Sequence, residues 1–268
     1  MHKIVFPVLL IGIFTISSCN NTEKKNSSTK DSLNNNTSGP SDSPGNKGFA
    51  YPVIQPNGTS GSDFVPNGWT ILDSASGDLN NDKNNDFAFV LQHRDSVSVI
   101  VPNPDDISRD TTVMTQPRIL VVAFFNSATK QYDLVEQSNT FILNHDDSNQ
   151  KDPFEKGNIS ISAGALKIVI TNAFEADMGS WIENTYQFRY QGKEFQLVWA
   201  ETNSIARFQG ASEVVSYDFI TKKVKIVTND GSGGKDKVQW KTFDVKEMKT
   251  LETFKEPFTW KIEKDVLI

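Results

Sequence analysis

The sequence predicts an all-β fold built as an antiparallel meander, arranged either propeller-like or as a two-sheet sandwich, with one short C-terminal helix. Short runs rich in β-branched and aromatic residues recur along the chain, and turn signals separate them. Apolar and polar residues alternate within several runs, which is typical of strands with one buried face. Strands do not alternate with long helical segments, so a parallel α/β sheet is not expected.

The alternation is clearest in the second half of the chain. Tyr186, Phe188 and Tyr190 fall on one face of a predicted strand, and residues 223–227 alternate lysine with valine or isoleucine. Residues 118–126 are more uniformly apolar, which predicts a central strand.

The remaining elements follow from the same signals. The predicted strands, in chain order, are Trp69–Leu72, Phe87–Gln92, Val97–Val101, Arg118–Asn126, Tyr132–Glu136, Asn158–Ser162, Leu166–Phe174, Trp181–Tyr190, Phe195–Glu201, Glu213–Phe219, Lys223–Thr228 and Val238–Phe243. Hairpin turns are expected at Tyr190–Phe195 and Ile220–Lys223. Pro102–Gln116 and Asn144–Phe154 are expected to be surface loops, and Asp244–Phe254 a helix of two or three turns.

The first residues of the chain predict a secretory signal. A short cationic start is followed by an apolar run from Ile4 to Ile16 and by small residues before Cys19. The apolar run is too short to predict a membrane span. Ile16–Cys19 also resembles the lipobox of bacterial lipoproteins, which implies cleavage before Cys19 and acylation of its thiol. The alternative is an ordinary signal peptide with an incidental cysteine.

Residues 19–48 contain almost no apolar side chains. Such a segment cannot bury enough surface to offset the entropy of ordering it. We therefore predict a signal peptide at 1–18, a disordered tether at 19–48 that starts from lipidated Cys19, and a single all-β domain at 49–268. Asn20 is not the aspartate that resembles an inner-membrane retention signal, so we expect an outer-membrane position in the bacterial cell envelope.

Charge and cysteine content exclude several classes of partner and site. The formal net charge is −6, which argues against nucleic acid as a partner. No polybasic patch favours anionic lipid, so membrane attachment would come from the acyl anchor alone. Cys19 is the only cysteine, and the mature domain therefore has no thiol for a disulfide, a zinc cluster or a nucleophile.

The most specific chemistry lies in the stretch that precedes residues 87–91, an apolar run. Oxygen-bearing side chains occur at alternating positions, which is the register in which a tight loop wraps a hard cation. The predicted Ca²⁺ ligands are Asp78, Asn80, Asp82 and Asp86 through their side chains and Asn84 through its backbone carbonyl. The alternative is a polar turn held by hydrogen bonds from side chains to the backbone.

This pattern resembles the calcium loop of FG-GAP and VCBS-type repeats. Those repeats usually carry glycine at the sixth loop position, where this chain has Lys83. The chain shows the motif once, so repeats do not support a complete propeller. The longer pattern resembles a family of uncharacterised bacterial exported lipoproteins; it comprises the loop, Asp152–Phe154, Gly179–Trp181, Tyr186–Tyr190 and Ser216–Phe219. That resemblance implies an architecture and no known activity.

Trp181 and Arg189 are candidate ligand-binding residues, because aromatic residues on the hairpins of exported β domains can stack on sugars. Aromatic residues at a period of two are also typical of a core. No nucleophile elbow or phosphate-binding loop is present to indicate catalysis. Acidic pairs, among them Asp105/Asp106, Asp146/Asp147 and Glu175/Asp177, could serve a glycosidase.

The sequence thus predicts a membrane-anchored envelope lipoprotein whose calcium-stabilised β domain is a non-catalytic binding or structural module. Its expected partners are the membrane and an envelope protein or a glycan. The alternative is a glycan-active hydrolase that uses loop carboxylates.

Overall fold

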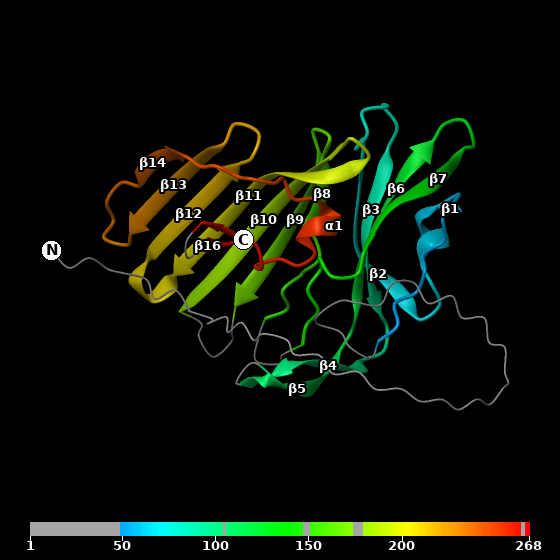
Figure 1. The fold of residues 1–268 in the computed structure, drawn as a ribbon, viewed down its shortest axis with the longest axis horizontal. Coiled ribbons are helices and arrows are strands. Elements are labelled where there is room, and N and C mark those ends of the chain that lie inside the picture. Colours follow the sequence, from blue (N-terminus) through cyan, green and yellow to red (C-terminus); the bar gives the residue numbers. More distant parts are fainter. Residues whose placement is uncertain (1–48, 104–105, 147–150, 174–178, 264–265) are drawn as a thin grey trace, which may run out of the picture. The chain divides into compact units, whose positions relative to one another are not determined.

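The protein is all-β, as predicted, in a computed structural model that describes residues 49–103, 106–146, 151–173, 179–263 and 266–268 (Figure 1). The predicted signal peptide and the whole predicted tether, including Cys19, lie outside these residues. The described strands form a seven-stranded sheet, a five-stranded sheet and two short two-stranded ribbons. All the strand pairings between them are antiparallel, in agreement with the predicted meander.

The seven-stranded sheet is a complete meander, because each strand pairs with its neighbour in the sequence (Figure 1). Its strands are β8 (Ile159–Ser162), β9 (Ala165–Ala173), β10 (Ser180–Gln191), β11 (Glu194–Ala206), β12 (Ala211–Asp218), β13 (Lys223–Asp230) and β14 (Lys237–Thr242). One face packs on the core with Tyr186 and Phe188, both of which are fully buried. This confirms that the aromatic residues of β10 with a period of two belong to the core.

The five-stranded sheet has the order β1-β7-β6-β3-β2. Its strands are β1 (Asn57–Gly58), β2 (Trp69–Gly77), β3 (Asp86–His93), β6 (Arg118–Asn126) and β7 (Gln131–Ser138). β6 matches the predicted bounds and is central, as expected. Its uniformly apolar sequence has a direct cause, since alternate residues of β3 and β6 enter two different hydrophobic clusters.

The larger cluster joins the two sheets. Val90 and Val122 of the five-stranded sheet are buried in it together with Ile168 and Tyr186 of the seven-stranded sheet. A Cβ placed on Gly77 would lie 2.7 Å from Ile161 Cγ2, so the end of β2 approaches β8 more closely than another residue type would allow. The smaller cluster covers the other face of the five-stranded sheet, with Phe49, Tyr51 and Val65 at its edge.

The prediction of a surface loop at 102–116 is wrong over most of this range, because residues 106–115 form a strand. β5 (Asp106–Thr115) pairs with β4 (Val97–Asn103) to form a separate hairpin. Val99 is fully buried and lies opposite Val113. The polar sequence of β5 lacks the usual strand periodicity, so its strand conformation comes from pairing with β4.

The C-terminal helix is shorter than predicted. α1 spans only Leu251–Phe254, after a 3₁₀ turn η1 (Gly61–Phe64) and a second, η2 (Arg207–Gln209), earlier in the chain. The backbone just before α1 bonds to β11 instead, because Leu197 N donates to Lys249 O at 2.7 Å and Thr250 bridges to Gln196. The chain ends in a short ribbon of β15 (Lys261–Glu263) and β16 (Val266–Leu267).

Candidate functional site

The acidic loop predicted to bind Ca²⁺ connects β2 to β3. Leu79 is fully buried in the larger cluster and anchors the loop to the body of the domain. Asn81 and Lys83 have φ angles of 64° and 71°, so Lys83 adopts the left-handed conformation that glycine tolerates best. Lys83 stands at the sixth position of the motif, where FG-GAP and VCBS-type loops usually have glycine. It adopts the backbone geometry that suits a glycine.

Hydrogen bonds from the side chains to the backbone hold the exposed part of the loop. Asp78 Oδ2 accepts from Lys83 N at 2.9 Å, and Asp82 Oδ1 accepts from Asn84 N at 2.8 Å. Asn80 Oδ1 accepts from Asp82 N at 3.0 Å. The hydrogen bond that the Asn84 backbone N–H donates is the main reason why the pKa of Asp82 lies below its usual value. These contacts are those of the polar turn that was the alternative interpretation.

Asp86 has a different environment because its side chain is fully buried. Its Oδ2 accepts from Leu79 N at 2.8 Å and its Oδ1 accepts from Phe125 N at 3.0 Å. Burial raises the pKa of this carboxyl despite the two hydrogen bonds, and the nearby charges of Asp82 and Asp78 add to the increase. Asp86 therefore links the start of the loop, through Leu79, to Phe125 of β6.

The described residues contain no cluster of three or more His, Cys, Asp or Glu side chains arranged to hold a metal ion. Ca²⁺ binding by Asp78, Asn80, Asp82, Asn84 and Asp86 thus stays a prediction. The donor chemistry fits this ion, since every ligand is a hard oxygen atom. Each carboxylate oxygen that accepts one backbone hydrogen bond also keeps a second lone pair.

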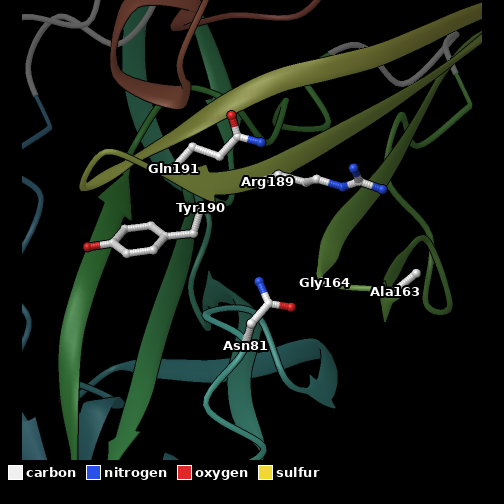
Figure 2. Close-up of a pocket in the computed structure, with 6 residues that line it drawn as sticks. All are labelled: Asn81, Ala163, Gly164, Arg189, Tyr190 and Gln191. Carbon is white, nitrogen blue, oxygen red and sulfur yellow. The ribbon is translucent and has the colours of Figure 1, made fainter. Parts of the chain in front are cut away.

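A small polar pocket lies beside this loop (Figure 2). Its volume is about 270 Å³, and three segments line it: Asn81 of the loop, Ala163 and Gly164 of the β8–β9 turn, and Arg189, Tyr190 and Gln191 at the end of β10. Arg189 was a predicted ligand-binding residue. The other five were not predicted. Tyr190 and Gln191 follow Arg189 on β10, whereas Asn81, Ala163 and Gly164 come from separate elements that no local sequence signal connects to it.

Trp181 does not join Arg189 in this pocket. Both side chains lie on the face of β10 opposite to Tyr186, but they are near opposite ends of the strand. At about 3.4 Å per residue they lie roughly 27 Å apart, so the two residues cannot form one platform. Trp181 is half-buried and lies between Ala173 and Ile205 on the neighbouring strands.

An ion pair between a buried arginine and a partly exposed aspartate, whose side chain is 33% exposed, joins β6 to the segment before β8. The Arg118 side chain is 2% exposed and forms a bidentate pair with Asp152, with Nη1–Oδ1 and Nη2–Oδ2 distances of 2.8 and 2.6 Å. Its Nε donates to Gln92 Oε1 and Nη1 also donates to Leu143 O. Because the buried guanidinium directs these hydrogen bonds to protein groups, the pair has a structural role.

Glu136 on β7 is an acidic residue with a strongly altered proton affinity. Burial, followed by the charge of Glu252 on α1, raises its pKa to about 7. Its side chain is half-buried and its backbone lies opposite Val122. Neither Glu136 nor Glu252 lines the pocket beside the acidic loop.

Comparison with models of protein families, with curated proteins and with solved structures gave no match. Within the described ranges, no helix is long and apolar enough to span a membrane.

Proposed function

We propose that the protein is a lipid-anchored lipoprotein of the bacterial cell envelope, whose β domain is a non-catalytic binding or structural module. The N-terminal sequence supports the anchor, with Cys19 as the lipidated residue and the tether as a spacer from the outer membrane. The expected partner is an envelope protein or a glycan, and nucleic acid is not expected because the chain is acidic.

The polar pocket is the observation that carries the binding role. Its six lining residues include one guanidinium and two carboxamides but no carboxylate. A glycoside hydrolase needs two carboxyl groups across the scissile bond, and this pocket does not supply them. Binding without catalysis is therefore the function that its chemistry favours.

The anchor predicts a clear result for Cys19→Ser. Without a thiol to acylate, the mature protein should lose lipid labelling and move from the membrane fraction to the soluble fraction. The measurement is incorporation of a labelled fatty acid together with fractionation of cells that express the full chain. A Ser18→Ala variant, which keeps the thiol, is the control. Equal labelling and fractionation of Cys19→Ser and wild type would contradict the proposal.

We also propose that the acidic loop binds a structural Ca²⁺ ion through the oxygen ligands named above. At a free Ca²⁺ concentration of 100 times the dissociation constant, binding should stabilise the domain by about 2.7 kcal/mol. For a domain of this size the melting temperature should rise by several degrees between EDTA and millimolar Ca²⁺.

Two variants make this experiment specific. Asp82→Ala should abolish the calcium-dependent rise, and Lys83→Gly should increase it because it removes a nearby positive charge and relieves the left-handed backbone conformation. Identical melting curves of the wild type in the two buffers, without binding heat in calorimetry, would reduce the loop to a polar turn.

A glycan-active hydrolase is the second candidate, and Glu136 is the observation that favours it. A carboxyl group whose pKa is raised to about 7 near a second carboxylate is typical of a general acid. Hydrolysis of a glycan that is lost in Glu136→Gln and retained in Arg189→Gln would favour this alternative over the binding role.

A further inference from the structure

We propose that the pocket beside the acidic loop binds an acidic saccharide unit, with the Arg189 guanidinium on its oxyanion (Figure 2). The inference rests on the proposed binding role and deepens it by naming a class of ligand. It does not depend on the lipid anchor or on the Ca²⁺ ion, so each can be tested separately.

Two tight turns border the pocket and fix the backbone around it. Ala163 and Gly164 connect β8 to β9 with φ angles of 50° and 70°, and Gly192 and Lys193 connect β10 to β11 with φ angles of 61° and 79°. Consecutive positive φ angles are those of the two-residue hairpin turn that best fits the twist of the strands. The backbone that carries the lining residues is therefore fixed before a ligand arrives, and only the exposed side chains have to be ordered on binding.

Gly164 also allows the acidic loop to approach the turn. A Cβ at this position would lie 3.3 Å from Asn81 Oδ1, closer than an ordinary van der Waals contact. The absence of a side chain thus lets the Asn81 carboxamide lie against the turn, where Figure 2 shows it facing the same space as the end of β10.

Arg189 supplies an available positive charge. Its side chain is exposed, and it forms no hydrogen bond or ion pair with the described residues. The residues directly opposite it on the neighbouring strands are Ala165 and Gln196, neither of which is charged. A guanidinium presents a planar set of donors that can form a bidentate hydrogen-bonded pair with a carboxylate or phosphate group.

The carboxamides of Asn81 and Gln191 supply the remaining polar groups. Among the described residues, neither side chain forms a hydrogen bond, so both can donate to and accept from a ligand. A carboxamide has both functions, as does a sugar hydroxyl group. One cation with two such groups therefore suits an oxyanion that has neighbouring hydroxyl groups, and a volume of about 270 Å³ suits a small ligand.

Isothermal titration calorimetry of the purified full chain tests this proposal. The probes are glucuronic acid and glucose 6-phosphate, which carry a carboxylate and a phosphate, with glucose as the neutral match and inorganic phosphate as the anion without a sugar. Because the pocket is open to water, we expect affinities in the high micromolar to millimolar range. At least one acidic sugar should bind ten or more times as tightly as glucose, and more tightly than inorganic phosphate.

The variants separate the pocket from general charge effects. Arg189→Gln should weaken binding of the acidic sugar at least tenfold, Arg189→Lys should weaken it less, and Gln191→Ala should weaken both the acidic sugar and glucose. Arg207→Gln is the matched control, because it removes an exposed arginine at the opposite end of β11. Melting curves of all variants should match the wild type, since these side chains are exposed.

Three results would overturn the proposal. They are equal affinity of Arg189→Gln and wild type for the acidic sugar, glucose binding as tight as that of the acidic sugars, and binding of inorganic phosphate with no binding of either acidic sugar. A failed lipid anchor would leave the pocket affinity unchanged, so the two failures can be told apart.

Discussion

Asp152→Ala is expected to lower the free energy of unfolding by about 2–4 kcal/mol, because it removes the ion-pair partner of the buried Arg118 guanidinium. The effect is smaller than for a fully buried pair, since the Asp152 side chain is 33% exposed. It also removes the acceptor of the Phe154 backbone N–H. For a domain of this size the melting temperature should fall by about 10 °C. Chemical and thermal unfolding at pH 7 measure the change.

Two controls isolate the contribution of this ion pair. Lys151→Ala breaks the neighbouring ion pair with Glu155, whose side chains are 52% and 55% exposed, and should change stability by less than about 1 kcal/mol. The double variant Arg118→Met/Asp152→Leu should be more stable than Asp152→Ala, since it leaves no uncompensated buried charge. A loss in Asp152→Ala no larger than that in Lys151→Ala would contradict the assigned role of the pair.

The pair should also protect the fold down to acidic pH. Burial acts against the charged form, but the hydrogen bonds from Arg118 and Phe154 and the Arg118 charge hold the pKa of Asp152 below its usual value of 3.8. The carboxyl therefore binds protons less readily in the folded state than in the unfolded chain. Its contribution is fully present above pH 3.8 and is lost as the pH falls through the lower folded pKa.

Glu136→Gln is expected to stabilise the domain at pH 8 and to have little effect near pH 4. The pKa of Glu136 is about 7 in the folded state and 4.5 in the unfolded chain, so the folded state binds the proton more tightly. Wild-type stability should therefore fall as the pH rises from 4.5 to 7, because the unfolded chain releases this proton while the half-buried carboxyl of the folded state still binds it. Contact with water reduces the effect, and we expect a gain of about 1–3 kcal/mol for the variant at pH 8.

Melting curves of wild type and Glu136→Gln between pH 4 and pH 8 check this expectation. Glu252→Gln should give part of the same gain, since the Glu252 charge contributes to the raised pKa after burial. Glu247→Gln, at an exposed position before α1, is the control for a general loss of negative charge. A difference between Glu136→Gln and wild type that does not change with pH would contradict the raised pKa.

The strands of the meander could be predicted from the sequence because their signals are local. In β10, alternation is enough to place Tyr186 and Phe188 in the core, and both are fully buried. β6 has the predicted bounds, Arg118–Asn126, because a run of consecutive apolar residues fits a strand that is covered on both faces. The β10–β11 turn was also expected, since Gly192 favours the positive φ that this turn requires.

Tertiary structure decided the features that depend on contacts between distant segments. Residues 106–115 became a strand through pairing with β4. Most of the expected helix at 244–254 did not form, and the backbone carbonyl of Lys249 accepts a hydrogen bond from β11 instead. The sequence shows Arg118 as one polar residue at the start of an apolar strand, and only the fold brings Asp152 to its guanidinium.

The pocket depends on tertiary structure in the same way. The sequence by itself determined the all-β class, and it shows the apolar run before Cys19 and the oxygen-rich register of the acidic loop, because each depends on residues that are close in the sequence. It could indicate Arg189 as an exposed polar residue on a strand. Asn81 and Gly164 come from two other elements, and only the packing of the acidic loop against the β8–β9 turn places them beside it.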